Sequence, residues 1–545
     1  MRNTAVMIAA MFISKGLGAV LKIPLGNILG GVGMGYFTTA YSIFTPVLSF
    51  VCAGIPTILT RSVASYAANK EYSKIRSARR CSLILAAAAG ILGAALIYIA
   101  ALPFVGFIAN SPESLPGVLV IAPAVLFCSV TAVYRGYYEG LNDMLPTALS
   151  QVIEAIVKAG LGVGLSYFVY SNGERLFGSQ SASLPFAAAA AILGVTVSEM
   201  CGTLFIFLRA RRKSDSFAEY DEKLTGKEIF ALCKEIFFKA LPISLGAAAS
   251  NLLSLADMLT ISNCVDLSAS LFAPRWEADP FLSRISAAEG GAGNFMYGCY
   301  AGIIMSVYML AAAASAVVGR CVMPRLAFAA ETHQFADTER ELRLLIKGTA
   351  VISAPLTVFM AVLSQPILRI LYPFRETEAA LSALPLTILS AGGIAAALLG
   401  AVCTVFYAYG DFSYPIKITL IGGALKLLFN IAFIIVPELN ITGAAISAVL
   451  SNLICLLLAG REAEKKLGVR VRYASYSLPA IFAALGGGTG VYLFFRGLSE
   501  NMGTLAGVLI SIVLGSIMYI LILYIADSRD SRAVIDILRR KAECR

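Results

Sequence analysis

Four lysines lie inside long apolar segments of the sequence, where a charged side chain is costly. They are Lys15, Lys22, Lys158 and Lys426. A lysine near the centre of a bilayer costs roughly 2.5–3.5 kcal/mol on the insertion scale, so such residues face protein or water instead of lipid. Lysine is also a good point-charge partner for phosphate. The four lysines therefore predict a polar interior that binds an anion.

Depth separates the four lysines into two groups. Lys15, Lys158 and Lys426 each lie about eleven or twelve residues from the expected inner end of their segment, which is near mid-membrane at about 1.5 Å per residue. Lys22 follows Lys15 by two helical turns, so both project from one face, with Lys22 nearer the outer surface. Lys15 is too deep to reach the interface, whereas Lys22 can either extend to the interface or join the cavity.

Two polar residues accompany the deep lysines on their own segments. Glu154 precedes Lys158 by four residues, the favourable order for an i,i+4 ion pair. This pair either belongs to the site or is only structural. Asn430 follows Lys426 by one turn and either contacts the ligand or hydrogen-bonds a neighbouring helix.

Three further candidates lie on the second and seventh apolar segments. Arg61 ends the second segment and is either an orientation signal or a site residue. Asp257 lies nearer the outer surface of the seventh segment, with Asn251 deeper. If the segments that carry these groups and the lysines line one cavity, the cavity is polar with an excess of positive charge.

The sequence carries no signature of catalysis or of a cofactor. It lacks a Walker-type glycine loop and an HExxH pair, and we expect no enzymatic activity. The eleven cysteines are scattered and His333 is the only histidine, which argues against a metal site and thiol catalysis. Cys264 and Cys299 flank a long outward connection expected at about 263–293, and the sequence leaves open a disulfide between them.

The composition is that of a polytopic membrane protein. Charged residues make up 14% of the 545 residues, against about 25% in soluble domains, and the mean hydropathy is +0.79. A membrane span needs about 20 mostly apolar residues, which predicts fourteen spans in an all-α protein. The predicted spans are 4–26, 34–60, 82–108, 115–138, 145–170, 184–208, 240–262, 294–318, 348–372, 380–407, 413–436, 440–460, 474–495 and 503–526.

The basic residues are distributed as orientation signals. Of the 43 lysines and arginines, 33 fall in loops, helix ends and tails that share one side, with Arg135 among them, and six fall on the other side. The positive-inside rule then predicts a multi-pass membrane protein with an even number of spans and both termini in the cytoplasm. The same distribution accounts for the net charge of +10 without a nucleic-acid partner.

The sequence also indicates a duplication. Residues 137–146 and 407–415 both read Tyr-x-x-Gly, then Asp, then a proline that opens the next helix. The offset of about 270 residues corresponds to six spans, so the copies have the same orientation, an arrangement found in secondary transporters. We predict an N-lobe at 1–215, a C-lobe at 216–460, and two added helices with a cytoplasmic tail at 461–545.

Several motifs resemble the stage V sporulation protein B family and its lipid II flippase relatives. The most specific match is Arg135-Gly136-Tyr137-Tyr138-Glu139-Gly140 followed by 144–154, and the matches extend from about residue 8 to 455. The others are 14–18 with Lys22, Gly54-Ile55-Pro56 running into 61–64, 240–243 with Asp257, the Gly422, Lys426 and Asn430 series, and Gly443-Ala444-Ala445.

The resemblance implies the fold of the multidrug/oligosaccharidyl-lipid/polysaccharide (MOP) exporter superfamily, with two six-helix lobes around a central cavity. It implies a flippase that moves an undecaprenyl-diphosphate-linked saccharide, such as lipid II, to the outer leaflet by alternating access. The cavity lysines would hold the diphosphate, and the last two helices would form a groove for the lipid tail. One departure bears on lipid II itself, because Leu48-Ser49-Phe50 stands where better-known lipid II flippases carry arginine.

Two other functions stay open at this stage. One is a cation-coupled exporter of small organic molecules, which twelve spans and acidic cavity groups would favour. The other is a non-transporting scaffold for cell-envelope or spore synthesis, which needs no water-filled pocket around Lys15. For the flippase we expect a monomer driven by the membrane potential or an ion gradient, with cell-envelope synthesis proteins as partners.

Overall fold

All regular structure in the described part of the chain is helical. The computed structural model describes residues 2–69, 71–212, 226–286, 290–331, 335–411, 413–467 and 473–526. The chain divides into two compact units, unit 1 at Met1–Ile303 and unit 2 at Ile304–Arg545. The division at residue 303 differs from the predicted lobe boundary between 215 and 216. The predicted boundary separates two sequence repeats, and it stays a prediction.

Unit 1 contains long helices interspersed with short ones. Its elements are α1 (Arg2–Ala68), α2 (Tyr72–Pro103), η1 (Phe104–Ile108), η2 (Pro112–Ser114), α3 (Leu115–Ile121), α4 (Ala124–Gly140), α5 (Leu145–Ser171), α6 (Gly173–Phe177), α7 (Leu184–Arg212), α8 (Gly226–Leu271), α9 (Ala273–Ala278), α10 (Pro280–Ser286) and α11 (Ala292–Tyr297). The π-helical segment η3 (Gly298–Ile304) follows α11.

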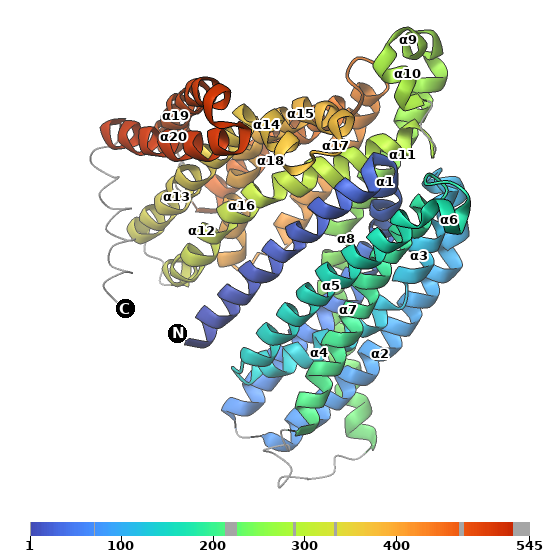
Figure 1. Cartoon of the computed structure of the whole chain (residues 1–545). Coiled ribbons are helices and arrows are strands. Elements are labelled where there is room, and N and C mark those ends of the chain that lie inside the picture. The colour runs from blue at the N-terminus through green and yellow to red at the C-terminus, as the bar shows by residue number, and fades with distance from the viewer. Residues whose placement is uncertain are drawn as a thin grey trace. The chain divides into compact units, whose positions relative to one another are not determined.

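Unit 2 is built from nine helices in its described part. They are α12 (Met305–Glu331), α13 (Phe335–Val362), α14 (Ser364–Leu371), α15 (Glu376–Ala391), α16 (Gly393–Ala408), α17 (Ser413–Ile434), α18 (Asn440–Leu467), α19 (Tyr473–Met502) and α20 (Thr504–Ala526). The last two pack against each other as a pair (Figure 1).

The number of spans differs from the predicted fourteen. In the described residues, eleven helices are long and apolar enough to cross a membrane, or twelve if α15 and α16, bent by 44°, count as one span. Two predicted spans, 4–26 and 34–60, lie in the single helix α1, and the predicted span 240–262 lies within the 46-residue α8. The all-helical polytopic class is confirmed, whereas the count of fourteen is not.

The helix α1 changes direction at Gly30 without an intervening loop. Gly30 has φ 62° and ψ −167°, a conformation that glycine alone adopts readily. Helical backbone continues on both sides of this residue. The sequence predicts a connection between the spans 4–26 and 34–60. In the structure these residues belong to one helix that bends at Gly30.

Small residues bring the helices of unit 1 close together. A Cβ atom on Gly136 of α4 would lie 2.7 Å from the carbonyl oxygen of Pro56 in α1. Next to this contact, the Thr60 hydroxyl donates to the Gly136 carbonyl at 3.0 Å. Gly54 makes a similarly close approach to Ala240 of α8. These contacts are typical of membrane helices, where packing at small residues replaces the hydrophobic effect.

The two connections that suggest a duplication share one backbone geometry. Asn142, after α4, has φ 60°, and Gly410, after α16, has φ 72°. The amide of Asp143 donates to the Tyr138 carbonyl, and the amide of Asp411 donates to the Phe406 carbonyl, both at 2.9 Å. Both turns are therefore left-handed helix caps with the same five-residue closure, as in a Schellman motif.

The expected outward loop at 263–293 is largely helical. The end of α8 and the short helices α9 and α10 occupy most of it, and Trp276 on α9 is buried with its indole donating to Ser268. Cys264 and Cys299 are buried free thiols, so the disulfide that the sequence left open is not formed.

Candidate functional site

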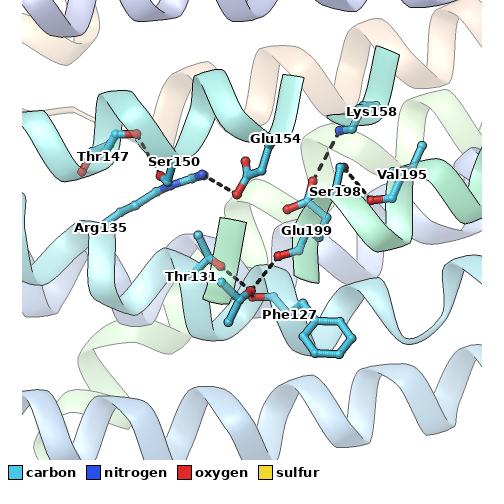
Figure 2. Close-up of polar contacts among 11 residues, drawn as sticks. Phe127, Thr131, Arg135, Thr147, Ser150, Glu154, Lys158, Val195, Ser198 and Glu199 are labelled. Carbon is cyan, nitrogen blue, oxygen red and sulfur yellow. Dashed lines mark hydrogen bonds and ion pairs between the residues drawn. The ribbon is translucent and has the colours of Figure 1, made fainter. Parts of the chain in front are cut away.

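Four charged side chains form a network across three helices of unit 1 (Figure 2). The Arg135 guanidinium on α4 pairs with Glu154 on α5, with Nη2 and Oε1 separated by 2.6 Å. The Lys158 ammonium on α5 pairs with Glu199 on α7, with Nζ and Oε1 separated by 3.3 Å. We call Arg135, Glu154, Lys158 and Glu199 the charge network.

Helix α5 positions the middle of the charge network because it packs against both α4 and α7 (Figure 1). Glu154 and Lys158 are one turn apart and share a face of α5. The sequence predicted that they pair with each other, and this is wrong. Each reaches a partner of opposite charge on another helix, because α4 and α7 bring a guanidinium and a carboxylate to the same face.

Polar and small neighbours hold Arg135 and Glu154 in place. The Arg135 Nε donates to the Ser150 hydroxyl at 2.9 Å, and that hydroxyl donates to the Thr147 carbonyl (Figure 2). On the other side, Gly202 of α7 leaves the space that the Glu154 carboxylate occupies, since a Cβ at this position would overlap its Oε1. A glycine at 202 is thus part of the architecture of the network.

A second set of hydrogen bonds fixes the helix turn that carries Glu199. The hydroxyls of Thr131 on α4 and Thr203 on α7 lie 2.7 Å apart. Thr203 also lies 2.7 Å from the Glu199 carbonyl and 3.1 Å from the Phe127 carbonyl. Thr203 therefore links α7 to α4 at the turn that carries Glu199. This link holds the backbone from which the Glu199 side chain reaches Lys158.

The cations of the network are more exposed than the carboxylates. Lys158 is 27% exposed against 12% for Glu199, and Arg135 is 20% exposed against 10% for Glu154. A charge exposed to lipid is unfavourable, so the accessible part of Lys158 favours water or a ligand. The network as a whole is neutral when all four groups are charged, and each carboxylate is less exposed than its cation.

Two further groups lie within electrostatic range of the Lys158–Glu199 pair. They are the Tyr41 phenol on α1 and the Cys128 thiol on α4. The pair is therefore approached from two neighbouring helices, α1 and α4. A change in the protonation or contacts of Glu199 would alter the electrostatic environment of both Tyr41 and Cys128.

The other predicted residues of unit 1 lie outside this network. The side chain of Lys15 lies outside the part of the structure that is described. Lys22 is half-buried on α1 and makes no hydrogen bond or ion pair to any described residue, and a Cβ on Gly18, one turn before it, would meet open space. Arg61 is exposed on α1.

The two predicted residues on α8 contact different parts of α1 and α11. Asn251 donates to the Ser49 hydroxyl at 2.8 Å, at the position where the sequence departs from better-known lipid II flippases. Asp257 is within electrostatic range of Tyr297, a fully buried tyrosine of α11. Unit 2 carries Lys426, which is half-buried on α17, and Asn430, which is fully buried on the same helix.

Sequence reasoning missed two members of the charge network. Arg135 lies near the end of a predicted span, where the sequence indicates an orientation signal. Glu199 is not among the predicted site residues, although a carboxylate within the apolar segment 184–208 is itself a signal of function. Both partners come from other segments, so the sequence could flag these residues but not pair them.

Comparisons with known proteins identify the class of this chain. Its fold is similar to a solved structure of the lipid II flippase MurJ in an inward closed conformation, with a TM-score of 0.65 and 15% identity over 97% of this chain and 100% of that chain. Residues 286–525 match the lipid II flippase MurJ family. The chain is thus a membrane transporter of the MOP exporter superfamily, related to lipid II flippases.

The family follows from the longer match. Residues 1–329 match the family described as polysaccharide biosynthesis protein, and the chain belongs to this family. Two relatives come from Bacillus subtilis. Stage V sporulation protein B is 20% identical over 88% of this chain and 86% of its own length, and the uncharacterized membrane protein YabM is 22% identical over 82% and 76%.

Proposed function

We propose that this protein is a flippase that moves an undecaprenyl-diphosphate-linked saccharide from the inner to the outer leaflet by alternating access. The chain is a multi-pass membrane protein of a family of lipid-linked precursor flippases and polysaccharide transporters. The proposal includes the bacterial plasma membrane with cytoplasmic termini, and a monomer that works beside cell-envelope synthesis proteins.

The observation that carries the proposal is the Lys158–Glu199 pair. It lies in the middle of two apolar helices, and its cation is the more accessible partner. A diphosphate is acceptor-only and doubly charged, so it can replace the Glu199 carboxylate as the partner of Lys158. Lys22 supplies a second cation on α1, together with the predicted contribution of Lys15.

Exchange of partners would couple binding to motion. When a diphosphate takes Lys158, Glu199 is left as a buried carboxylate without its counter-ion, which is unfavourable by several kcal/mol. Uptake of a proton by Glu199 removes that cost. A ligand shifts a conformational equilibrium only by its differential affinity for the two states, and this exchange provides such a difference. The drive would be the membrane potential or an ion gradient.

The test measures flipping of a fluorescent undecaprenyl-diphosphate disaccharide in proteoliposomes. Lys158→Ala should lower the rate at least tenfold, because the diphosphate loses its partner. The control Lys74→Ala removes an exposed lysine of unit 1 that pairs with Glu71 at 3.0 Å, and it should flip at the wild-type rate. Equal rates in the two variants would contradict the role of Lys158.

A double variant separates ligand binding from a structural role of the pair. Lys158→Met combined with Glu199→Leu removes both charges, a replacement that is often neutral or stabilising for a buried pair. If the pair were only structural, the double variant would recover flipping. The proposal predicts a folded protein that stays inactive, whereas Glu199→Gln alone should bind the diphosphate more tightly and release it more slowly.

A further inference from the structure

Two cysteine thiols meet where the first turns of α8 pack against α2. The Cys81 thiol of α2 hydrogen-bonds the Cys233 thiol of α8. Cys81 also donates to the Ile229 carbonyl, with Sγ and the oxygen separated by 3.6 Å. In the helix that same carbonyl accepts from the backbone amide of Cys233. Both contacts therefore place the two sulfur atoms side by side.

Apolar packing holds the two helices together around this thiol pair. Ile75 and Ala78 of α2 and Ile236 of α8 are buried in one hydrophobic cluster with Cys81. Cys233 is partly buried and packs against the same cluster. The thiols thus belong to a packed helix interface and not to a loop, so the fold itself keeps them close.

This end of the interface is in contact with water. Glu235 and Lys239 form an ion pair on α8, and both side chains are more than half exposed. Lys74, in the first turn of α2, is exposed as well. Exposed charges of this density are unfavourable in lipid, which indicates an aqueous boundary. Cys233 is the more exposed of the two thiols, so a dissolved oxidant meets it first.

The first part of α8 is a segment that the helix holds only weakly to the rest. Pro242 lies inside α8 and has no backbone N–H, so the Phe238 carbonyl lacks the intrahelical donor that another residue would supply. Helices bend at such prolines. Before Pro242, packing against the neighbouring helices α1 and α2 is what positions the segment. A covalent bond from Cys233 to α2 would therefore restrain it.

We propose that Cys81 and Cys233 are a redox-modifiable pair whose disulfide fastens the first part of α8 to α2. Hydrogen peroxide is the oxidant. The Cys233 thiolate attacks one peroxide oxygen and becomes a sulfenic acid, and the other oxygen leaves as water with the thiol proton. The Cys81 thiolate then attacks the Cys233 sulfur, the S–S bond forms, and the sulfenic oxygen leaves as a second water. The two sulfurs lose two electrons in total, and the peroxide gains them.

The experiment measures disulfide formation in the purified full-length protein. The reduced protein is treated with hydrogen peroxide, the remaining thiols are blocked with N-ethylmaleimide, and the peptides are mapped by mass spectrometry. We expect a cross-linked peptide that joins Cys81 to Cys233 with the loss of two hydrogens, and dithiothreitol should reverse it. Full labelling of Cys233 after peroxide, or its disulfide with another cysteine, would overturn the proposal.

Two variants separate this pair from general oxidation. Cys81→Ser should stop at the sulfenic acid of Cys233, which dimedone traps, because no second thiol is present to displace the oxygen. The matched control Cys403→Ser removes a half-buried thiol of α16 and should form the same disulfide as the wild type. Amide hydrogen exchange over 226–241 should slow on oxidation in the wild type and not in Cys81→Ser. An equal response of the two proteins would refute the restraint on α8.

The consequence for transport rests on the proposed function. The proposed topology puts this end of unit 1 in the cytoplasm, where glutathione keeps thiols reduced, so the disulfide would form under oxidative stress. Alternating access requires helices to change their packing, and a bond between α2 and α8 holds one arrangement. Peroxide should therefore slow flipping by the wild type, reversibly with dithiothreitol, and not by Cys81→Ser.

The two proposals fail in different ways. Flipping at the full rate by the cross-linked protein would overturn the regulatory role of the disulfide. A reduced protein that does not flip the lipid-linked saccharide would reject the proposed function and leave the Cys81–Cys233 disulfide in place, because its formation is measured without transport.

Discussion

Helices α5 and α17 begin after similar turns, but the lysine in the middle of each helix has different neighbours. Each follows a left-handed cap, and each carries a lysine thirteen residues after its first residue, Lys158 after Leu145 and Lys426 after Ser413. On α5 that lysine pairs with Glu199. On α17 the lysine is half-buried and lies within electrostatic range of Tyr308 on α12.

The difference shows which features the shared turn controls. The cap determines where the helix begins and hence how deep the lysine lies. The partner of the lysine depends on residues in other helices, and these differ between the two units. One lysine is therefore part of a network that is neutral when all four groups are charged, and the other lies within electrostatic range of a tyrosine on α12.

The largest effect is expected from removing the guanidinium that pairs with Glu154 of α5. Arg135→Ala leaves the Glu154 carboxylate buried without its guanidinium, which should lower the free energy of unfolding by about 3–5 kcal/mol. Cys403, the residue of α16 at the equivalent distance before its turn, is a half-buried free thiol, and Cys403→Ala should cost about 1 kcal/mol. Thermal unfolding in detergent compares the two, and similar losses would refute the role of Arg135.

An intermediate effect is expected from crowding the network without removing a charge. In Gly202→Ala the new methyl group overlaps Glu154, which must move away from Arg135, at a cost of about 1–3 kcal/mol. Gly160→Ala on α5 adds a methyl group in open space and should leave the unfolding temperature unchanged or slightly raised. If the two variants unfold at the same temperature, the charge network does not require a glycine at position 202.

The smallest effect concerns the turn before α17. Asp411 accepts hydrogen bonds from the amides of Ser413 and Tyr414 and pairs with Lys466 at 2.6 Å. The hydrogen bond from Lys466 holds the pKa of Asp411 below its ordinary value of 3.8. Because the pKa is lower in the folded state, this stabilisation is present above pH 3.8 and is lost as the pH falls further.

Asp411→Asn should therefore lower stability by about 0.5–1 kcal/mol at pH 7, in the range of a helix-capping contact. The difference from wild type should shrink as the pH is lowered from 5 to 3. Thermal unfolding at several pH values measures it. A difference that is constant with pH would show that the carboxylate charge contributes nothing at this turn.

Much of the architecture was predictable from local pattern. The apolar segments, the all-helical class and the two related turns follow from composition and from residues close in the chain, such as Asn142 and Gly410 at positions that need positive φ. The number of spans was harder to predict, because Gly30 breaks α1 without a polar loop and α8 extends well past its apolar part.

Residue counts along single helices predict that lysines lie deep in apolar segments. The partners of these lysines depend on how the helices pack in the folded protein. Glu199 is 41 residues from Lys158, and Arg135 is 19 residues from Glu154, so helix packing and not spacing brings each pair together.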